Sequence, residues 1–248
     1  MLSNLLSKLT VRTNNCLFGR ARRSRLAAGF TLIELLVVLA IIVIISLIIF
    51  TSASKFNSAI LLRSLAYDVG LAVREAQLYG VAVRETSGSA TCSTGGSTQF
   101  CAWYGVHFDT SHNNKFFVFA DIDESGEYDS SPDVQTDLFQ TQYGFIISDF
   151  CVGSPSTNQS YCSAACPSST VLTDAGLPTN NCTSNALTDL DITFRRPDPN
   201  AYIMPTFSAG VVGPVVTYTG ALVTVQTPGG EMRSVSVSST GQIAVLND

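Results

Sequence analysis

The stretch AGFTLIELLVVLAIIVIISLIIF, residues 28–50, decides how the rest of this chain is organised. Glu34 is its only charged residue, and residues 35–50 carry no charge and a single hydroxyl group, that of Ser46. At about 1.5 Å per residue, an apolar helix of about 20 residues crosses a hydrocarbon core about 30 Å thick. Residues 30–54 are therefore predicted to form a transmembrane helix.

The segment before this helix, residues 1–29, is strongly basic. It has six basic residues and no acidic one, whereas the whole chain has a net charge of −5, so the remainder carries −11. A basic end before an apolar segment stays in the cytoplasm, and the acidic remainder is then exported. We therefore expect a single-pass protein of the cytoplasmic (inner) membrane. An acidic exported part also argues against nucleic-acid binding, which needs a basic surface.

The residues after the apolar stretch, 55–85, predict that the same helix continues into water. Apolar residues recur every three or four positions, which gives one apolar stripe along a helix. The members of that stripe are Ile60 or Leu61, Leu65, Val69, Ala72 or Val73, Ala76, Tyr79 and Val83. Charged residues such as Arg63, Asp68 and Arg74 lie between them. This second half of the helix should therefore pack against the protein's own folded domain.

Residues 86–248 are predicted to form a β-rich domain, because the apolar period changes to two. A loop rich in Ser, Thr and Gly, residues 86–99, precedes the first strand. Strands are expected at residues 101–108, 115–121, 144–149, 190–195, 221–227, 232–237 and 242–246. Glycine-containing turns separate the last three, which should form a meander. The expected fold class is α+β: one long N-terminal helix whose second half packs on a C-terminal antiparallel β-domain.

The cysteines predict an oxidising compartment. Cys16 lies in the basic segment, and the six others are Cys92, Cys101, Cys151, Cys162, Cys166 and Cys182. Four of the six lie in an insertion at about residues 150–188 that is rich in Ser, Thr and Asn and has no periodicity. An even number of cysteines in such sequence favours disulfides over the alternative of buried free thiols. We expect Cys92–Cys101 to close a hairpin and the other four cysteines to pair within the insertion, as staples of an irregular loop.

An acidic run after the second expected strand has the spacing of an EF-hand-like calcium loop. Oxygen-bearing side chains alternate over nine residues, at Asp121, Asp123, Ser125, Glu127 and Asp129. Gly126 stands where such a loop turns sharply, but Pro132 stands at the twelfth position, where a bidentate Glu belongs. The pattern predicts weak calcium binding. A solvated acidic turn between two strands is the alternative.

Other signs of chemistry are weak. His107 and His112 are the only histidines, and without a nearby set of Cys or Glu they are expected to be loop or strand-edge residues. The sequence has none of the motifs GxSxG, GxGxxG, P-loop or HExxH, and no nucleophile is paired with a base. We therefore do not expect an enzyme.

The stretch AGFTLIELLVV, residues 28–38, closely resembles the processing site of type IV prepilins. The resemblance implies cleavage between Gly29 and Phe30 by prepilin peptidase, N-methylation of Phe30 and a role for Glu34 in assembly. The implied partners are other pilin or pseudopilin subunits, the inner-membrane assembly platform and membrane lipid. Because an unpaired carboxylate in hydrocarbon is costly, Glu34 is expected to pair with a Phe30 amine. The alternatives are a headgroup-level Glu34, and ordinary signal-peptide cleavage near Ala53.

The rest of the chain resembles the minor pseudopilin group called GspH/FimT. Three stretches carry this resemblance: LAYDVGLAVREAQ (residues 65–77), FVFADIDESGEYD (residues 117–129) and the glycine-turn region of residues 223–245. It implies a structural subunit of a type II secretion or type IV pilus-like filament. The cysteine-rich insertion departs from the usual pattern of the group. The rival hypothesis is a membrane-tethered extracytoplasmic binding module that does not polymerise, and the sequence does not choose among secretion, pilus and DNA-uptake machines.

Overall fold

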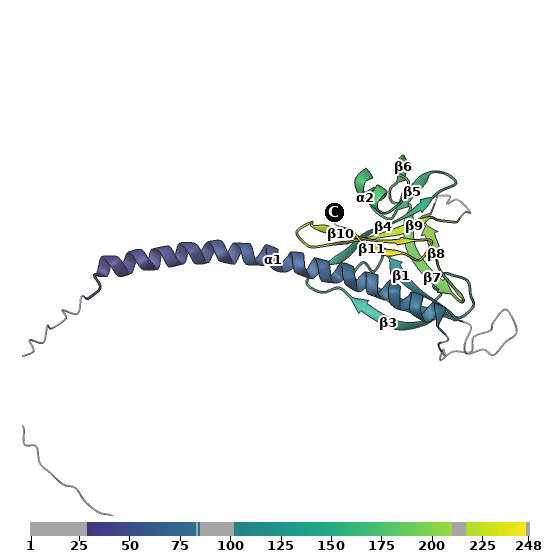
Figure 1. The fold of residues 1–248 in the computed structure, drawn as a ribbon, viewed down its shortest axis with the longest axis horizontal. Helices are drawn as coiled ribbons and strands as arrows, with labels where there is room; N and C mark the ends of the chain where they lie inside the picture. Colours follow the sequence, from purple (N-terminus) through teal and green to yellow (C-terminus); the bar gives the residue numbers. More distant parts are fainter. Residues whose placement is uncertain (1–28, 83, 85–101, 210–216, 247–248) are drawn as a thin grey trace, which may run out of the picture. The chain divides into compact units, whose positions relative to one another are not determined.

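The computed structural model describes residues 29–82, 84, 102–209 and 217–246 (Figure 1). The chain divides into two compact units, one ending at Ile49 and the other beginning at Phe50. Helix α1 begins at Leu32 and ends at Val81, so it forms most of the described part of the first unit, and the second unit opens with the rest of this helix. The helix therefore ends four residues before the end of the expected continuation, residues 55–85.

Within the second unit, the face of α1 that packs on the β-domain consists mainly of Ala and Val side chains. Its buried apolar residues are Leu62, Ala66, Val69, Ala72, Val73 and Ala76. The expected stripe is wrong only at its start, because Ile60 and Leu61 are exposed. Leu65 and Tyr79 are partly buried against the core, as expected, and Val83 lies outside the described residues. Near the end of the helix, a Cβ atom on Gly80 would lie 2.5 Å from the carbonyl oxygen of Phe194, so the backbone itself packs on a strand.

The second unit also contains eleven strands and a short helix among its described residues (Figure 1). Their bounds are β1 Trp103–Asp109, β2 Lys115–Asp121, β3 Val134–Gln140, β4 Ile146–Ser154, β5 Gln159–Cys162, α2 Ser169–Asp174, β6 Asn181–Thr183, β7 Leu187–Arg195, β8 Asp198–Phe207, β9 Gly220–Gln226, β10 Met232–Ser238 and β11 Ile243–Val245. The fold is thus the expected combination of an N-terminal apolar helix and a β-domain.

In the described part of the chain, these strands form two sheets. One has the order β3-β2-β1-β7-β8, and the other has the order β11-β10-β9-β4-β5-β6. The strand pairs are antiparallel apart from β5 and β6, which run parallel, so the second sheet is mixed rather than purely antiparallel. The expected meander is present as β9, β10 and β11.

A single buried cluster joins α1 to both sheets. It includes Val69 of α1, Val106 and Phe194 of the first sheet, and Val223 and Val235 of the second sheet. Along β1, Val106 and Phe108 point into this cluster, and the residues between and beyond them point to the opposite face of the sheet. This alternation places polar side chains of β1 and β7 together on the outer face.

The expectation of an irregular loop at about residues 150–188 is wrong. That segment contains the end of β4, all of β5, α2 and β6, and the start of β7. Ser, Thr and Asn weaken the two-residue period of these short strands, so the sequence does not show them. The strands are ordered by other means: β4 pairs with β9, which lies far away in the sequence, and the Cys151–Cys162 disulfide links β4 to β5.

Two further strands, β3 and β8, were not expected from the sequence. Both are edge strands of the first sheet. The prolines at 199 and 205 of β8 argue against a central strand but are tolerated at an edge, where one row of backbone groups has no ladder partner.

Candidate functional site

The start of α1 is a helix cap built from the residues of the processing motif. Thr31 precedes the helix, and its Oγ1 accepts a hydrogen bond of 3.3 Å from the backbone N–H of Glu34. The Thr-x-x-Glu spacing is that of a capping box. A negatively charged side chain in the first turn also interacts favourably with the positive end of the helix dipole. Glu34 therefore stabilises the beginning of the helix as well as carrying a charge into an apolar segment.

The residues at the expected processing junction lie outside the helix. Gly29 and Phe30 are exposed and have no helical hydrogen bonding, and the Phe30 side chain is 83% exposed. Among the described residues, one helical segment is long and apolar enough to cross a membrane, and it is Leu32–Phe50. Its 19 residues extend for about 28 Å at the rise of an α-helix, which matches a bilayer core.

Four of the six expected disulfide cysteines pair within the second unit. Cys151 bonds to Cys162, its direct partner across β4 and β5, and Cys166 bonds to Cys182. The Sγ atoms of Cys162 and Cys182 are 3.6 Å apart, so the two disulfides lie against each other. Closing loops of this size stabilises a fold by about 3 kcal/mol each in the chain-entropy model.

These bonds hold the end of the second sheet together, where the strands are short. Cys151 and Cys162 also pack with Leu172 of α2 and Leu177 in a small buried cluster. The other two cysteines, Cys92 and Cys101, lie outside the described residues, so the bond between them stays a prediction.

The acidic run is a tight loop that begins at the end of β2. Asp121 is fully buried and accepts hydrogen bonds from the backbone N–H groups of Ser125 and Gly126, at 3.2 and 2.7 Å. Gly126 has a φ of +88°, a backbone conformation that glycine adopts without strain. Asp133 folds back, and its carboxylate accepts from the N–H groups of Ile122 and Asp129.

The carboxylates that come together are not the full alternating set. Asp121, Asp123 and Asp133 each place an oxygen within 4.8 Å of the other two. Ser125 instead donates its hydroxyl to the carbonyl of Glu127, and Asp129 contributes its backbone N–H. Burial, together with the charges of Asp133 and Asp123, raises the pKa of Asp121 to about 7, although the Gly126 hydrogen bond acts the other way.

A second polar cluster, which the sequence analysis did not anticipate, lies on the outer face of the first sheet. His107 of β1 places its Nδ1 2.7 Å from Oδ1 of Asp191, its register partner on β7. Asp109 of β1 is the register partner of Asp189. His107 and Asp191 are 84 positions apart in the sequence. The periodicity of each strand predicted the alternation, but nothing local indicated which strand would lie beside β1.

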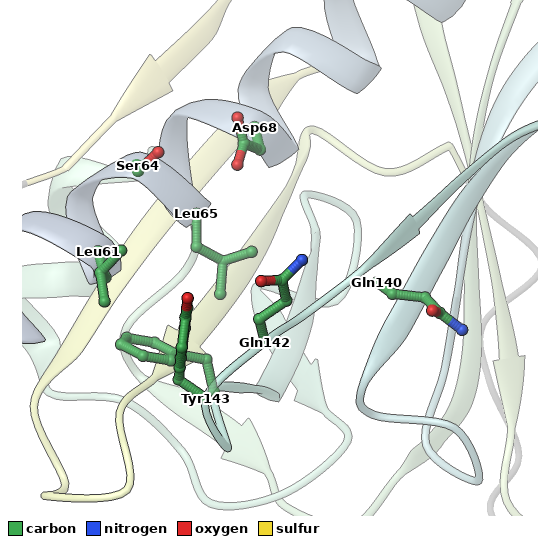
Figure 2. A pocket seen from close by; sticks show the side chains of 8 residues that line it. Leu61, Ser64, Leu65, Asp68, Gln140, Gln142 and Tyr143 are labelled. Carbon is green, nitrogen blue, oxygen red and sulfur yellow. The ribbon is translucent and has the colours of Figure 1, made fainter.

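A small hollow lies between α1 and the segment after β3 (Figure 2). It holds about 130 Å³ and is lined by Leu61, Leu65 and Asp68 on the helix side and by Gln142 and Tyr143 on the other. Ligand pockets usually hold about 300 Å³ or more. Burial raises the pKa of Asp68, and the side chains across the hollow include those of Gln142 and Tyr143. The hollow therefore offers packing rather than chemistry.

Comparison with known proteins gives one match. Residues 24–50 match the family model of the prokaryotic N-terminal methylation motif. No curated protein and no solved structure matches the chain. The matched segment contains the Gly29-Phe30 junction, the Thr31 cap, Glu34 and the apolar part of α1. A motif of this kind supports a type IV pilin-like subunit that is processed by prepilin peptidase and assembles with other pilins.

Proposed function

We propose that this chain is a minor pilin or pseudopilin of the GspH/FimT kind. It acts as a structural subunit of a type II secretion or type IV pilus-like filament, and it is not an enzyme. Before assembly it is anchored in the cytoplasmic membrane by Leu32–Phe50, with its N-terminus in the cytoplasm and the β-domain on the other side. The observation that carries the proposal is the methylation motif at residues 24–50, placed on an exposed junction directly before an apolar helix.

The geometry of that junction suits a peptidase followed by a methyltransferase. Gly29 and Phe30 precede the first helical residue, so the peptide bond between them is not protected by helical hydrogen bonds. Cleavage there removes the basic leader and leaves a new amine at Phe30. That amine lies one helical turn before Glu34, which supplies the opposite charge that a buried ammonium group needs.

Two features support the minor subtype. The β-domain is large relative to the anchor, and it carries a disulfide-linked region made of β5, α2 and β6. Such a stapled region adds a distinct surface at one end of the second sheet, which fits a specialised subunit better than a repeating one. It supports a minor role in general, since the insertion departs from the usual pattern of the GspH/FimT group.

The mature N-terminus tests this proposal. The full chain is produced in a host that contains prepilin peptidase, extracted from membranes and analysed by intact mass and by sequencing of the N-terminal peptide. We expect a chain that begins at Phe30 and carries one methyl group on its amine. The same chain in a host lacking the peptidase should retain residues 1–29.

Two outcomes would contradict the proposal. A mature chain that begins near Ser54 would mean an ordinary secretory signal. A leader retained in the presence of the peptidase would leave a membrane-tethered module that does not polymerise.

A further inference from the structure

The outer face of the first sheet carries a compact group of ionisable side chains, which we call the His107 patch. It consists of His107 and Asp109 on β1 and Asp189 and Asp191 on β7. Register pairing sets His107 beside Asp191 and Asp109 beside Asp189, and the two-residue period puts all four on one face. The patch is therefore fixed by two neighbouring strands rather than by a loop.

Asp191 holds the ring of His107 in one orientation. Its Oδ1 is 2.7 Å from Nδ1 of His107, and its Oδ2 accepts a hydrogen bond of 3.2 Å from the backbone N–H of Tyr128. Asp191 is only 2% exposed. The rings of Phe117 and Tyr128 lie 4.9 and 5.1 Å from the His107 ring, centroid to centroid. The imidazole is thus held by a buried carboxylate on one edge and by aromatic rings around it.

Three ligand-type atoms converge beside this ring. A ring nitrogen of His107 and carboxylate oxygens of Asp109 and Asp189 all lie within 4.8 Å of one another. Asp109 is itself held by the backbone N–H of Ser111 and by Nδ1 of His112. The group borders a hollow of about 210 Å³ whose lining includes His107, Asp109 and His112. Solvent and small ions therefore have access to it.

The charge of the patch favours a cation. Asp109 lies beside Asp189 and Asp191 lies beside His107 on the same face, so three carboxylates lie close together. Lys115 on β2, which lines the hollow with His107 and Asp109, offsets only part of this negative charge. Burial raises the pKa of Glu127, which lies in the loop between β2 and β3. The charges of Asp191 and Asp189 raise that pKa further, so the negative charge of the patch extends to this loop.

We propose that His107, Asp109 and Asp189 bind a divalent transition-metal ion, with zinc as the ion that fits best. Imidazole nitrogen combined with carboxylate oxygen suits zinc, whereas calcium and magnesium favour sites made of oxygen alone. Zinc takes ligands at about 2.1 Å, so donors closer than about 4 Å are needed. The present donors lie within 4.8 Å of one another, so zinc binding would require the side chains to rotate toward the ion. Zinc also imposes little geometric preference of its own.

The surroundings are those of a metal-binding histidine. Such a histidine usually donates its second ring N–H to a carboxylate, and ligating carboxylates are themselves hydrogen-bonded. Asp191 holds His107 in this way, while His112 and Ser111 hold Asp109. Because the Tyr128 backbone also bonds to Asp191, the metal would tie the loop between β2 and β3 to the sheet. The site would stabilise a surface of the domain independently of the proposed role in a filament.

Equilibrium dialysis of the full chain in detergent micelles, without a polyhistidine tag, tests the site. Zinc content is measured after dialysis against low-micromolar zinc, and thermal unfolding is recorded with zinc and with chelator. We expect about one zinc ion per chain and a higher unfolding temperature with zinc. Calcium and magnesium at the same concentration should not displace zinc.

The variants separate this site from other donors. His107→Asn keeps a side-chain N–H for Asp191 but removes the second ring nitrogen, and Asp189→Asn removes one charged ligand. Each should weaken zinc binding at least 10-fold while the chain stays folded by circular dichroism. Asp123→Asn, in the acidic loop, is the matched control and should bind zinc like the unchanged chain. No stoichiometric zinc, or equal zinc binding by His107→Asn, overturns the proposal, as does loss of zinc in Asp123→Asn alone.

Discussion

The side-chain amide of Gln77, on helix α1, donates a hydrogen bond of 3.1 Å to the carbonyl oxygen of Gly241, in the turn between β10 and β11. The same nitrogen also donates to the carbonyl of Pro199 on β8, at 3.0 Å. Gln77 is only 9% exposed, and its carbonyl oxygen accepts from the guanidinium of Arg74. One side chain thus ties the helix to an edge strand of the first sheet and to a turn of the second.

Gln77→Leu should destabilise the domain, because it removes the donor from the buried carbonyl of Gly241 and from the carbonyl of Pro199. The expected loss in the free energy of unfolding is about 1–3 kcal/mol. Denaturant unfolding followed by the fluorescence of Trp103, the single tryptophan, measures it. Leu78→Ala, at a 63% exposed position on the same helix, is the control and should change stability by less than about 0.5 kcal/mol. Equal effects of the two substitutions would contradict a structural role for the amide.

Alanine substitutions at two glycines of α1 should change the stability of the domain in opposite directions. At Gly80 the new Cβ would lie 2.5 Å from the Phe194 carbonyl oxygen, so Gly80→Ala should cost about 1–3 kcal/mol. At Gly70 the nearest atoms are side-chain carbons of Ile243, Val245 and Val235, at 3.8–4.0 Å. Gly70→Ala should therefore stabilise the domain by about 0.5–1 kcal/mol, through helix propensity. Unfolding midpoints of both variants test this, and a stabilising Gly80→Ala would mean that the helix does not pack so closely.

Glu34→Gln should leave the protein inserted in the membrane but keep it out of filaments. Removing a charge from an apolar segment eases insertion, whereas pairing with the Phe30 amine of a neighbouring subunit requires the carboxylate. The measurement is crosslinking to neighbouring subunits in cells, with membrane fractionation as the check on insertion. Crosslinking of the variant at the level of the unchanged chain would show that the charge is not used in assembly.

The stability of the domain should depend on pH through the carboxyl group of Asp149. This carboxylate is 8% exposed and accepts hydrogen bonds of 2.8 Å from the Ser163 hydroxyl and the Ala164 N–H. Burial outweighs these bonds and raises its pKa in the folded protein. The folded state therefore binds this proton more tightly than the unfolded state, and the resulting stability is lost as the pH rises above about 4.

Asp149→Asn keeps the acceptor oxygen and removes the titration. The unfolding midpoint of the unchanged chain should fall relative to that of the variant when the pH is raised from about 4 toward 7. Asp174→Asn, at an exposed position at the end of α2, should follow the unchanged chain. Parallel pH profiles for all three proteins would mean that the Asp149 carboxyl ionises alike in both states.

Calcium binding by the acidic loop stays a prediction, with a changed ligand set. Asp121, Asp123 and Asp133 are the carboxylates that meet, and Pro132 still replaces the bidentate ligand. Affinity should lie in the range of about 10⁻⁴–10⁻³ M, and calcium at ten times the dissociation constant should stabilise the chain by about 1 kcal/mol.

Thermal unfolding of the full chain in detergent, with calcium or with a chelator, measures this effect. Asp121→Asn should abolish the shift, whereas Asp174→Asn should keep it. An unchanged unfolding temperature at several millimolar calcium would leave the loop as an acidic turn held together by its own backbone hydrogen bonds.

The sequence by itself determined the features that depend on neighbours along the chain. The charge-free run after Glu34 predicted the apolar helix, and the two-residue period located β1, β2 and β7 to within three residues of their observed starts. The hydrogen bond between Glu34 and Thr31 is equally local, because only three positions separate the two residues, but it was not predicted. These signals are local because a helix or strand shows its period in the residues that form it.

Only the tertiary structure decided which distant residues meet. The prolines of β8 argued against a strand, but β8 is stable at the edge of its sheet, where fewer backbone donors are needed. The short strands after Cys151 become ordered through their partner strands and disulfides. His107 lies beside Asp191 because β7 pairs with β1 across 84 positions of sequence. The pairing of strands depends on how α1 and both sheets together bury one shared core. The apolar period of a single segment does not show which other strand will lie beside it.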